Sequence, residues 1–216
     1  YYIHRPRSDT PIDETLRALD DLIHAGKIRY IGTSTFAAWQ LMESLWVSKE
    51  LGLNRVVCEQ PPFNLLDRRI ERELIPMAQT YGIGIITWSP LAYGLLTGKY
   101  NRGTNTPAGS RLAGKNPKLQ ALSNDKAFET IENLKPLSQA RGCKLSQYAV
   151  AWCVQVAGIT SVLIGPSNLN QFNDYLKGLM IKITKKDQSK IDQYIKPGSM
   201  ISPFYEADFG PHLYSR

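Results

Sequence analysis

The sequence predicts an α/β fold in which amphipathic helices cover a parallel sheet. Three observations support this prediction. Short apolar segments with strand character alternate with segments of helical periodicity. The distance from one strand to the next is roughly 28 residues, the length of a βα unit with short connections. The strands are apolar along their whole length, which is typical of strands buried on both faces.

The first βα unit consists of a strand at 2–4 and a helix that runs to Ala25. We expect Thr10 to cap this helix and Pro11 to take its first position, where the missing N–H has no intrahelical partner. Gly26 is expected just beyond the helix end, where a left-handed residue is common.

The later elements follow from the same two periodicities. Strands are expected at 28–32, 56–58, 84–88 and 161–164. Helices are expected at 37–50, 69–81, 125–141, 145–156, 168–179 and 185–195. Within the helix at 69–81, Pro76 requires either a kink or a position in the first turn.

Two segments lack this alternation. Residues 89–122 are rich in Gly, Pro, Asn and Ser and are too long for a connection without a function. Residues 197–216 have the composition of an aromatic, loop-like C-terminal tail. We therefore treat 1–216 as a single domain with one functional loop and one tail.

Five βα units are too few for a closed TIM (β/α)8 barrel, and three more would extend the chain to about 300 residues, a usual length for that fold. The sequence also starts with Tyr1-Tyr2-Ile3, which has the character of a strand interior. We therefore expect an N-terminally truncated barrel that covers the last five units. A self-contained doubly wound sheet is the alternative, although no strand is followed by G-x-G-x-x-G.

Composition excludes several classes of protein. A hydrophobic content of 43% excludes disorder, and only three cysteines in 216 residues exclude a disulfide scaffold and fit a cytoplasmic protein. No apolar run approaches the ~20 residues of a membrane helix. The net charge of +7 comes from basic residues interleaved with acids, which favours a solvated surface, then an anionic small ligand, over nucleic acid.

In either parallel architecture, ligands bind at the carboxyl ends of the strands. The residues that follow the strands are hydrogen-bonding side chains, one large aromatic, and Gly165 and Ser167 at a helix start, a position that favours anions. No Cys, His and carboxylate cluster is present, so we expect no metal site. This set suits a flat heteroaromatic ring that carries a carboxamide.

At these positions the sequence resembles the aldo-keto reductase family, specifically the branch with the potassium-channel β subunits and related bacterial reductases. Five motifs carry the resemblance in register: YIHRP (2–6), GKIRYIGTS (26–34), EQPPFNLL (59–66), ITWSPLAYGLLTGKY (86–100) and SVLIGPSNLNQ (161–171). The resemblance implies a TIM barrel that binds NADPH and reduces a small carbonyl substrate, an aldehyde or ketone, to an alcohol.

The resemblance also implies roles for individual residues. His4 matches the active-site histidine that orients and polarises the carbonyl oxygen, and Ser34 and Gln60 match the residues that bind the nicotinamide carboxamide. Trp88 matches the plate on which the nicotinamide stacks. The other matches are the pyrophosphate segment Ser89, Pro90, Leu91 and Ala92, the covering-loop residues Lys99 and Arg111 within 89–122, and the adenosine-phosphate residues Gly165, Ser167, Gln171 and Asp174.

The sequence departs from the family pattern in three respects, and three functional hypotheses therefore stay open. Thr35 replaces the commoner Asn or Arg, and Tyr175 replaces Asn. The family's catalytic Tyr, Lys and Asp lie on strands before this sequence starts. The first hypothesis is an NADPH-dependent reductase, inactive as this fragment. The second is a nucleotide-binding regulatory subunit similar to channel β subunits, which carry Asn where this chain has His4. The third is a non-catalytic partial gene product.

Overall fold

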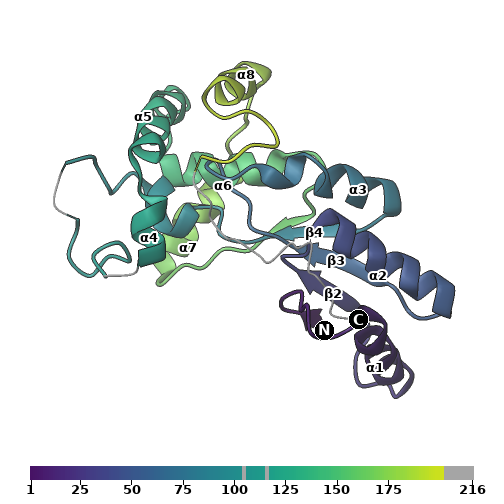
Figure 1. Ribbon diagram of the computed structural model, residues 1–216. Coiled ribbons are helices and arrows are strands. Elements are labelled where there is room, and N and C mark those ends of the chain that lie inside the picture. The colour runs from purple at the N-terminus through teal and green to yellow at the C-terminus, as the bar shows by residue number, and fades with distance from the viewer. Residues whose placement is uncertain (104–105, 115–116, 202–216) are drawn as a thin grey trace.

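The computed structural model describes residues 1–103, 106–114 and 117–201 (Figure 1). Its centre is a parallel sheet of five strands in the order β1-β2-β3-β4-β5. This arrangement confirms the predicted α/β class and the predicted succession of strands. The strands are Tyr2–Ile3 (β1), Ile31–Ser34 (β2), Val56–Gln60 (β3), Gly84–Thr87 (β4) and Ser161–Val162 (β5).

Strand β2 starts three residues later than the predicted strand at 28–32. The backbone amides of Lys27 and Ile28 both donate to the carbonyl of Leu22, at 2.9 and 3.4 Å. These bonds complete the end of the preceding helix, so the chain joins the sheet only from Ile31 onward.

The helices agree with the predicted periodicity in order and approximate extent. The α-helices are Ile12–His24 (α1), Ala38–Leu51 (α2), Leu74–Tyr81 (α3), Pro117–Leu122 (α4), Asp125–Ala140 (α5), Leu145–Gln155 (α6), Leu169–Gly178 (α7) and Lys185–Tyr194 (α8). Two 3-10 helices, Arg69–Glu71 (η1) and Ala92–Thr97 (η2), complete the set among the described residues. Helix α4 and η2 lie in the segment 89–122, where no helix is predicted.

The start of α1 differs from the prediction. Pro11 is the N-cap and the helix begins at Ile12, whereas Thr10 was expected to cap it. The Thr10 hydroxyl instead donates to the Asp9 carboxylate at 3.2 Å, so it turns away from the helix. At the other end, Gly26 has a φ of 68°, as expected for the residue beyond the cap.

The predicted helix at 69–81 is two elements, η1 and α3. Pro76 is the third residue of α3, which is the early-turn position that the sequence requires. A proline ring clashes with the carbonyl of the residue four positions earlier, here Arg72. A continuous helix through Arg72 is therefore disfavoured, and the chain breaks at Glu73 before α3 begins.

Two apolar clusters stabilise the fold. The first lies between the sheet and helices α1, α2 and α3, and includes Leu16, Ile31, Leu41, Val56 and Ile85. The second lies around α5, α6, α8 and η2, and includes Phe63, Leu96, Ile131, Trp152 and Ile191. Figure 1 shows the corresponding division, with α1 to α3 grouped at one side and α4, α5 and α8 at the other. Ile70 and Ile159 are the partly buried residues that pack against both clusters.

The opposite face of the sheet carries a close contact at Gly32. A Cβ atom on Gly32 would lie 2.6 Å from Cε1 of Tyr2 and 2.8 Å from Sγ of Cys58. The Cys58 thiol also donates to the Tyr2 hydroxyl at 3.1 Å. Glycine at this position therefore allows side chains of β1 and β3 to meet across β2.

Candidate cofactor site

The carboxyl ends of β2, β3 and β4 lie next to one another and carry Ser34, Gln60 and Trp88. The Ser34 hydroxyl donates to the backbone carbonyl of Gln60 at 2.9 Å. Trp88 donates its backbone N–H to the carbonyl of Pro61 at 3.0 Å and accepts from the amide of Phe63 at 3.2 Å. The sheet therefore brings together the three residues predicted to hold a nicotinamide.

His4 follows β1 directly, and its residue is exposed. The next residue, Arg5, donates from Nη1 to the Thr35 hydroxyl at 2.9 Å, which ties the end of β1 to the turn after β2. His4 therefore lies at the same end of the sheet as Ser34, one strand away. The catalytic role of His4 stays a prediction.

A cavity of about 700 Å³ lies between the end of β4 and the start of α7. Ten of the predicted cofactor residues line it: Trp88, Ser89, Pro90, Leu91, Lys99, Arg111, Gly165, Ser167, Gln171 and Asp174. Its size falls in the range of about 300–1,000 Å³ that is common for ligand pockets. Ser34, Gln60 and His4 do not line this cavity, and Ala92 is buried beside it in the second apolar cluster.

Residues for which the sequence predicted no role also line the cavity, including Tyr93, Thr97, Lys144 and Ser146. Tyr175, which replaces the family's usual Asn, lines it too. Lys144 precedes α6, and its ammonium lies 2.9 Å from the Asp174 carboxylate. Burial raises the pKa of the Tyr175 phenol, while the nearby Arg111 charge lowers it. Together with Lys99 and Arg111, Lys144 gives the cavity three cations against one carboxylate, a balance that favours an anionic ligand.

Hydrogen bonds within the chain already engage the start of α7. Asn168 is the N-cap, and its side chain accepts from the amide of Gln171 at 3.0 Å. The amide of Ser167 donates to Oε1 of Gln171 at 2.8 Å. The sequence predicted free amides here for a phosphate. In the structure, the Gln171 side chain would have to turn away before the Ser167 amide binds an anion.

Asp174 does not face the cavity as an isolated acid. Its Oδ1 accepts from the Lys144 ammonium and from Nε2 of Gln147, both at 2.9 Å. Spacing along α7 could not reveal this pairing, because both partners come from around the start of α6.

Four of the described residues other than glycine have positive φ angles, and all four follow the carboxyl ends of strands. Thr35 (59°) comes after β2, and Ser89 (62°), Ala92 (46°) and Tyr93 (54°) come after β4. Such conformations cost on the order of 1–3 kcal/mol each, and they concentrate at functional sites. None of these residues is a type that signals a left-handed conformation in a sequence.

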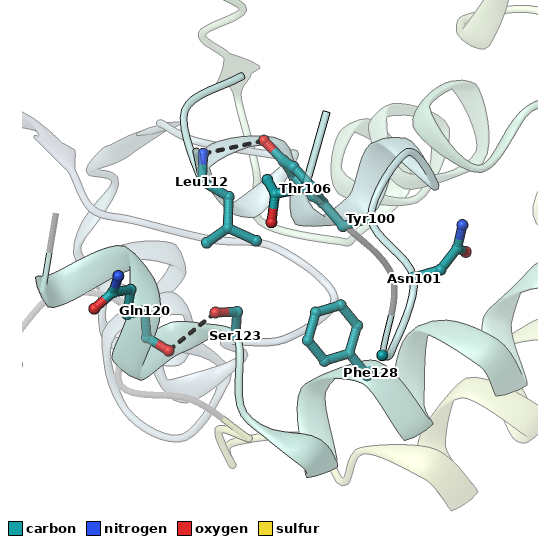
Figure 2. A pocket seen from close by; sticks show the side chains of 8 residues that line it. Tyr100, Asn101, Thr106, Leu112, Gln120, Ser123 and Phe128 are labelled. Carbon is teal, nitrogen blue, oxygen red and sulfur yellow. Dashed lines mark hydrogen bonds between the residues drawn. The ribbon is translucent and has the colours of Figure 1, made fainter. Parts of the chain in front are cut away.

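A smaller cavity of about 260 Å³ is lined by Tyr100 and Leu112 together with Gln120 of α4 and Phe128 of α5 (Figure 2). The Tyr100 hydroxyl accepts from the Leu112 amide at 3.4 Å, and the Ser123 hydroxyl donates to the Gln120 carbonyl at 2.9 Å. The Lys99 ammonium lies 5.0 Å from the centre of the Tyr100 ring. Tyr100 thus links the wall of the small cavity to Lys99 in the large one.

Among the described residues, no group of three or more His, Cys, Asp or Glu side chains is placed to hold a metal ion. Within the same residues, no helix combines the length and the apolar character needed to cross a bilayer.

Comparison with known proteins identifies the family of this fold and site. The model of the aldo/keto reductase family matches residues 1–196. Two similar proteins carry the name “Probable voltage-gated potassium channel subunit beta”. The Oryza sativa subsp. japonica protein is 41% identical over 181 residues, which cover 82% of this chain and 55% of the relative. The Arabidopsis thaliana protein is 38% identical over 200 residues, which cover 90% and 61%. The chain thus spans less than two thirds of either relative.

Proposed function

The chain belongs to the aldo/keto reductase family, and on this premise we propose that it is the cofactor-binding part of an NADPH-dependent reductase of aldehydes and ketones. Its five parallel strands are then the last five units of a (β/α)8 barrel. Residues 89–122 form the segment that covers the cofactor. The observation that carries the proposal is the single cavity that collects ten of the residues expected to bind NADPH.

The residues of the cavity fit the parts of a dinucleotide. Trp88 offers an aromatic face at the end of β4, and Lys99, Arg111 and Lys144 offer positive charge for phosphates. Ser34 lies outside this cavity, at the end of β2. Its hydroxyl already donates to the Gln60 carbonyl, so its oxygen is left to accept an N–H from the nicotinamide carboxamide.

Preference for NADPH over NADH follows from the charges around α7. An enzyme selective for NADH commonly places an acid to accept from the ribose 2′-hydroxyl. Asp174 of α7 lines the cavity, but its carboxylate already accepts hydrogen bonds from Lys144 and Gln147. A 2′-phosphate would meet the Ser167 hydroxyl and the cations of the cavity instead.

In the reaction, bound NADPH supplies the hydride. This chain's residues would bind and orient the reactants. Trp88 would hold the ring plane against β4, and the exposed imidazole of His4 would donate a hydrogen bond to the carbonyl oxygen as negative charge develops there. The resemblance places the proton-donating Tyr, with its Lys and Asp, on strands that precede residue 1.

Fluorescence titration of the 216-residue chain with NADPH and with NADH tests this proposal. We expect saturable binding that is tighter for NADPH. Binding of neither cofactor, or equal dissociation constants for the two, would contradict the corresponding part of the proposal. Turnover of aldehydes is expected only when the preceding three units are present.

A regulatory function is the second candidate, because both relatives are named as channel β subunits. In that case the chain would bind the nucleotide as a sensor. His4 favours the reductase, since the resemblance implies Asn at that position in channel subunits. Saturable NADPH binding without aldehyde turnover, in a protein that carries the preceding units, would favour the regulatory function.

A further inference from the structure

Strand β3 lies between two strained turns. Thr35 follows β2 and Ser89 follows β4, and both have positive φ angles although neither is glycine. A strained turn persists only where surrounding contacts hold it. The residue before each turn, Ser34 or Trp88, is one that we propose touches the nicotinamide. The groups that hold these turns therefore bear directly on the site.

Glu59 in β3 holds the turn after β2. Its residue is fully buried, and Oε1 accepts from the amide of Phe36 at 3.2 Å while Oε2 accepts from the Thr33 hydroxyl. These two donors lie on either side of Ser34 and Thr35 in the sequence. One carboxyl group thus ties down both ends of the turn.

Asn64 holds the turn after β4. It is also fully buried, and its Oδ1 accepts from the amides of Leu66 and Asp67 at 2.9 and 3.1 Å. These two bonds fix the orientation of the amide group. As a result, Nδ2 faces the carbonyl of Ser89, to which it donates at 3.3 Å.

We propose that Glu59 and Asn64 are positioning residues that hold Ser34 and Trp88 in place for a planar, carboxamide-bearing ring. Neither residue is expected to touch the cofactor. The inference rests on the proposed function and adds to it the two groups that pre-organise the nicotinamide end of the site. A buried carboxyl is costly in desolvation, which opposes keeping one here for packing alone.

The chain offers a matched control at the other end of the sheet. Asp20 is also a buried carboxyl, and its Oδ1 accepts from the backbone amide and from Nδ2 of Asn54, both at 2.8 Å. Asn54 precedes β3, whereas the candidate site follows it. Loss of the Asp20 carboxyl should lower stability without affecting Ser34 or Trp88.

The experiment measures NADPH dissociation constants and urea unfolding for wild type, Glu59→Ala, Glu59→Gln, Asn64→Asp and Asp20→Ala. We expect Glu59→Ala and Asn64→Asp to weaken NADPH binding by about tenfold or more, because each leaves buried groups without a partner. Glu59→Gln keeps an acceptor for Phe36 and should stay within about threefold of wild type. Asp20→Ala should unfold at lower urea and bind NADPH normally.

Hydrogen exchange in the absence of cofactor separates this inference from the proposed function. We expect faster exchange of amides in 34–37 in Glu59→Ala and in 88–89 in Asn64→Asp, but not in Asp20→Ala. If wild type binds no NADPH, the proposed function fails while exchange still tests the two positioning roles. The inference is overturned if Glu59→Ala and Asn64→Asp exchange at these turns like wild type. It is equally overturned if they bind NADPH as Asp20→Ala does. If Glu59→Ala does not fold, Asn64→Asp carries the test of positioning. Glu59→Gln should then exchange like wild type at 34–37, and faster exchange there would contradict the role given to the Glu59 acceptor.

Discussion

The guanidinium carbon of Arg68 lies 5.2 Å from the centre of the Trp152 ring, and the same ring stacks on Phe63 at 4.9 Å. Arg68 is almost fully buried, and its guanidinium donates hydrogen bonds to three other residues. It pairs with Glu71 at 2.7 Å and Asp192 at 2.8 Å, and it donates to the carbonyl of Ile195 at 2.7 Å. One cation thereby attaches α8 to the segment that follows β3.

Arg68→Met is expected to destabilise the chain by about 3–5 kcal/mol, because it leaves the Glu71 carboxylate buried without its partner. Urea unfolding measures the effect. The control is Arg7→Met, which removes an exposed pair with Asp9 and should leave the free energy of unfolding essentially unchanged. Equal stabilities of the two variants would contradict the role given to Arg68.

Glu59→Gln should change how stability depends on pH. Burial raises the pKa of Glu59 to about 7 from its ordinary value of 4.5. Because the folded state binds this proton more tightly, the stabilisation is fully present below the ordinary pKa. It is lost as pH rises toward 7. We expect wild type to lose up to about 3 kcal/mol of stability between pH 4.5 and 7 relative to Glu59→Gln. Parallel stability curves of the two proteins over this range would exclude the raised pKa.

Trp88→Ala should weaken NADPH binding by about tenfold, because it removes the aromatic face on which the ring would stack. Titration of NADPH fluorescence gives the dissociation constant. Trp46→Ala is the matched control, since Trp46 lies on α2 with 60% of its surface exposed. Equal affinities of the two variants would place the nicotinamide elsewhere.

His4→Ala should lower turnover more than cofactor affinity, in a protein that also carries the three preceding units. A hydrogen bond to the developing oxyanion contributes about 2.7–4 kcal/mol, or roughly 10²–10³ in rate. Steady-state aldehyde reduction and separate NADPH titration measure the two effects. His24→Ala, which alters an exposed side chain of α1, should change neither. A loss of affinity equal to the loss of rate would assign His4 to cofactor binding.

The sequence predicted the repeating part of this structure well and the contacts between distant segments poorly. Strand order, helix order and the early-turn position of Pro76 follow from periodicity and backbone sterics, which act over a few residues. The gathering of Trp88 and Ser167 in one cavity follows from the rule that parallel strands present their carboxyl ends together. In contrast, Arg68 meets Asp192 across 124 residues, and Asp174 meets Lys144 across 30. Such pairs depend on tertiary packing, and no local pattern marks them.

The two apolar clusters have a consequence for how the molecule loses its structure. Within the part of the chain that the structure describes, Ile70 and Ile159 are the only partly buried apolar residues that pack against both clusters, so few apolar side chains join them. Arg68 contacts Trp152 of α6 and Asp192 of α8, and it also pairs with Glu71 of η1. We therefore expect low cooperativity between the two clusters. Spectroscopic probes placed in α2 and near Trp152 should report separate denaturation midpoints, so one melting temperature would not describe the whole chain.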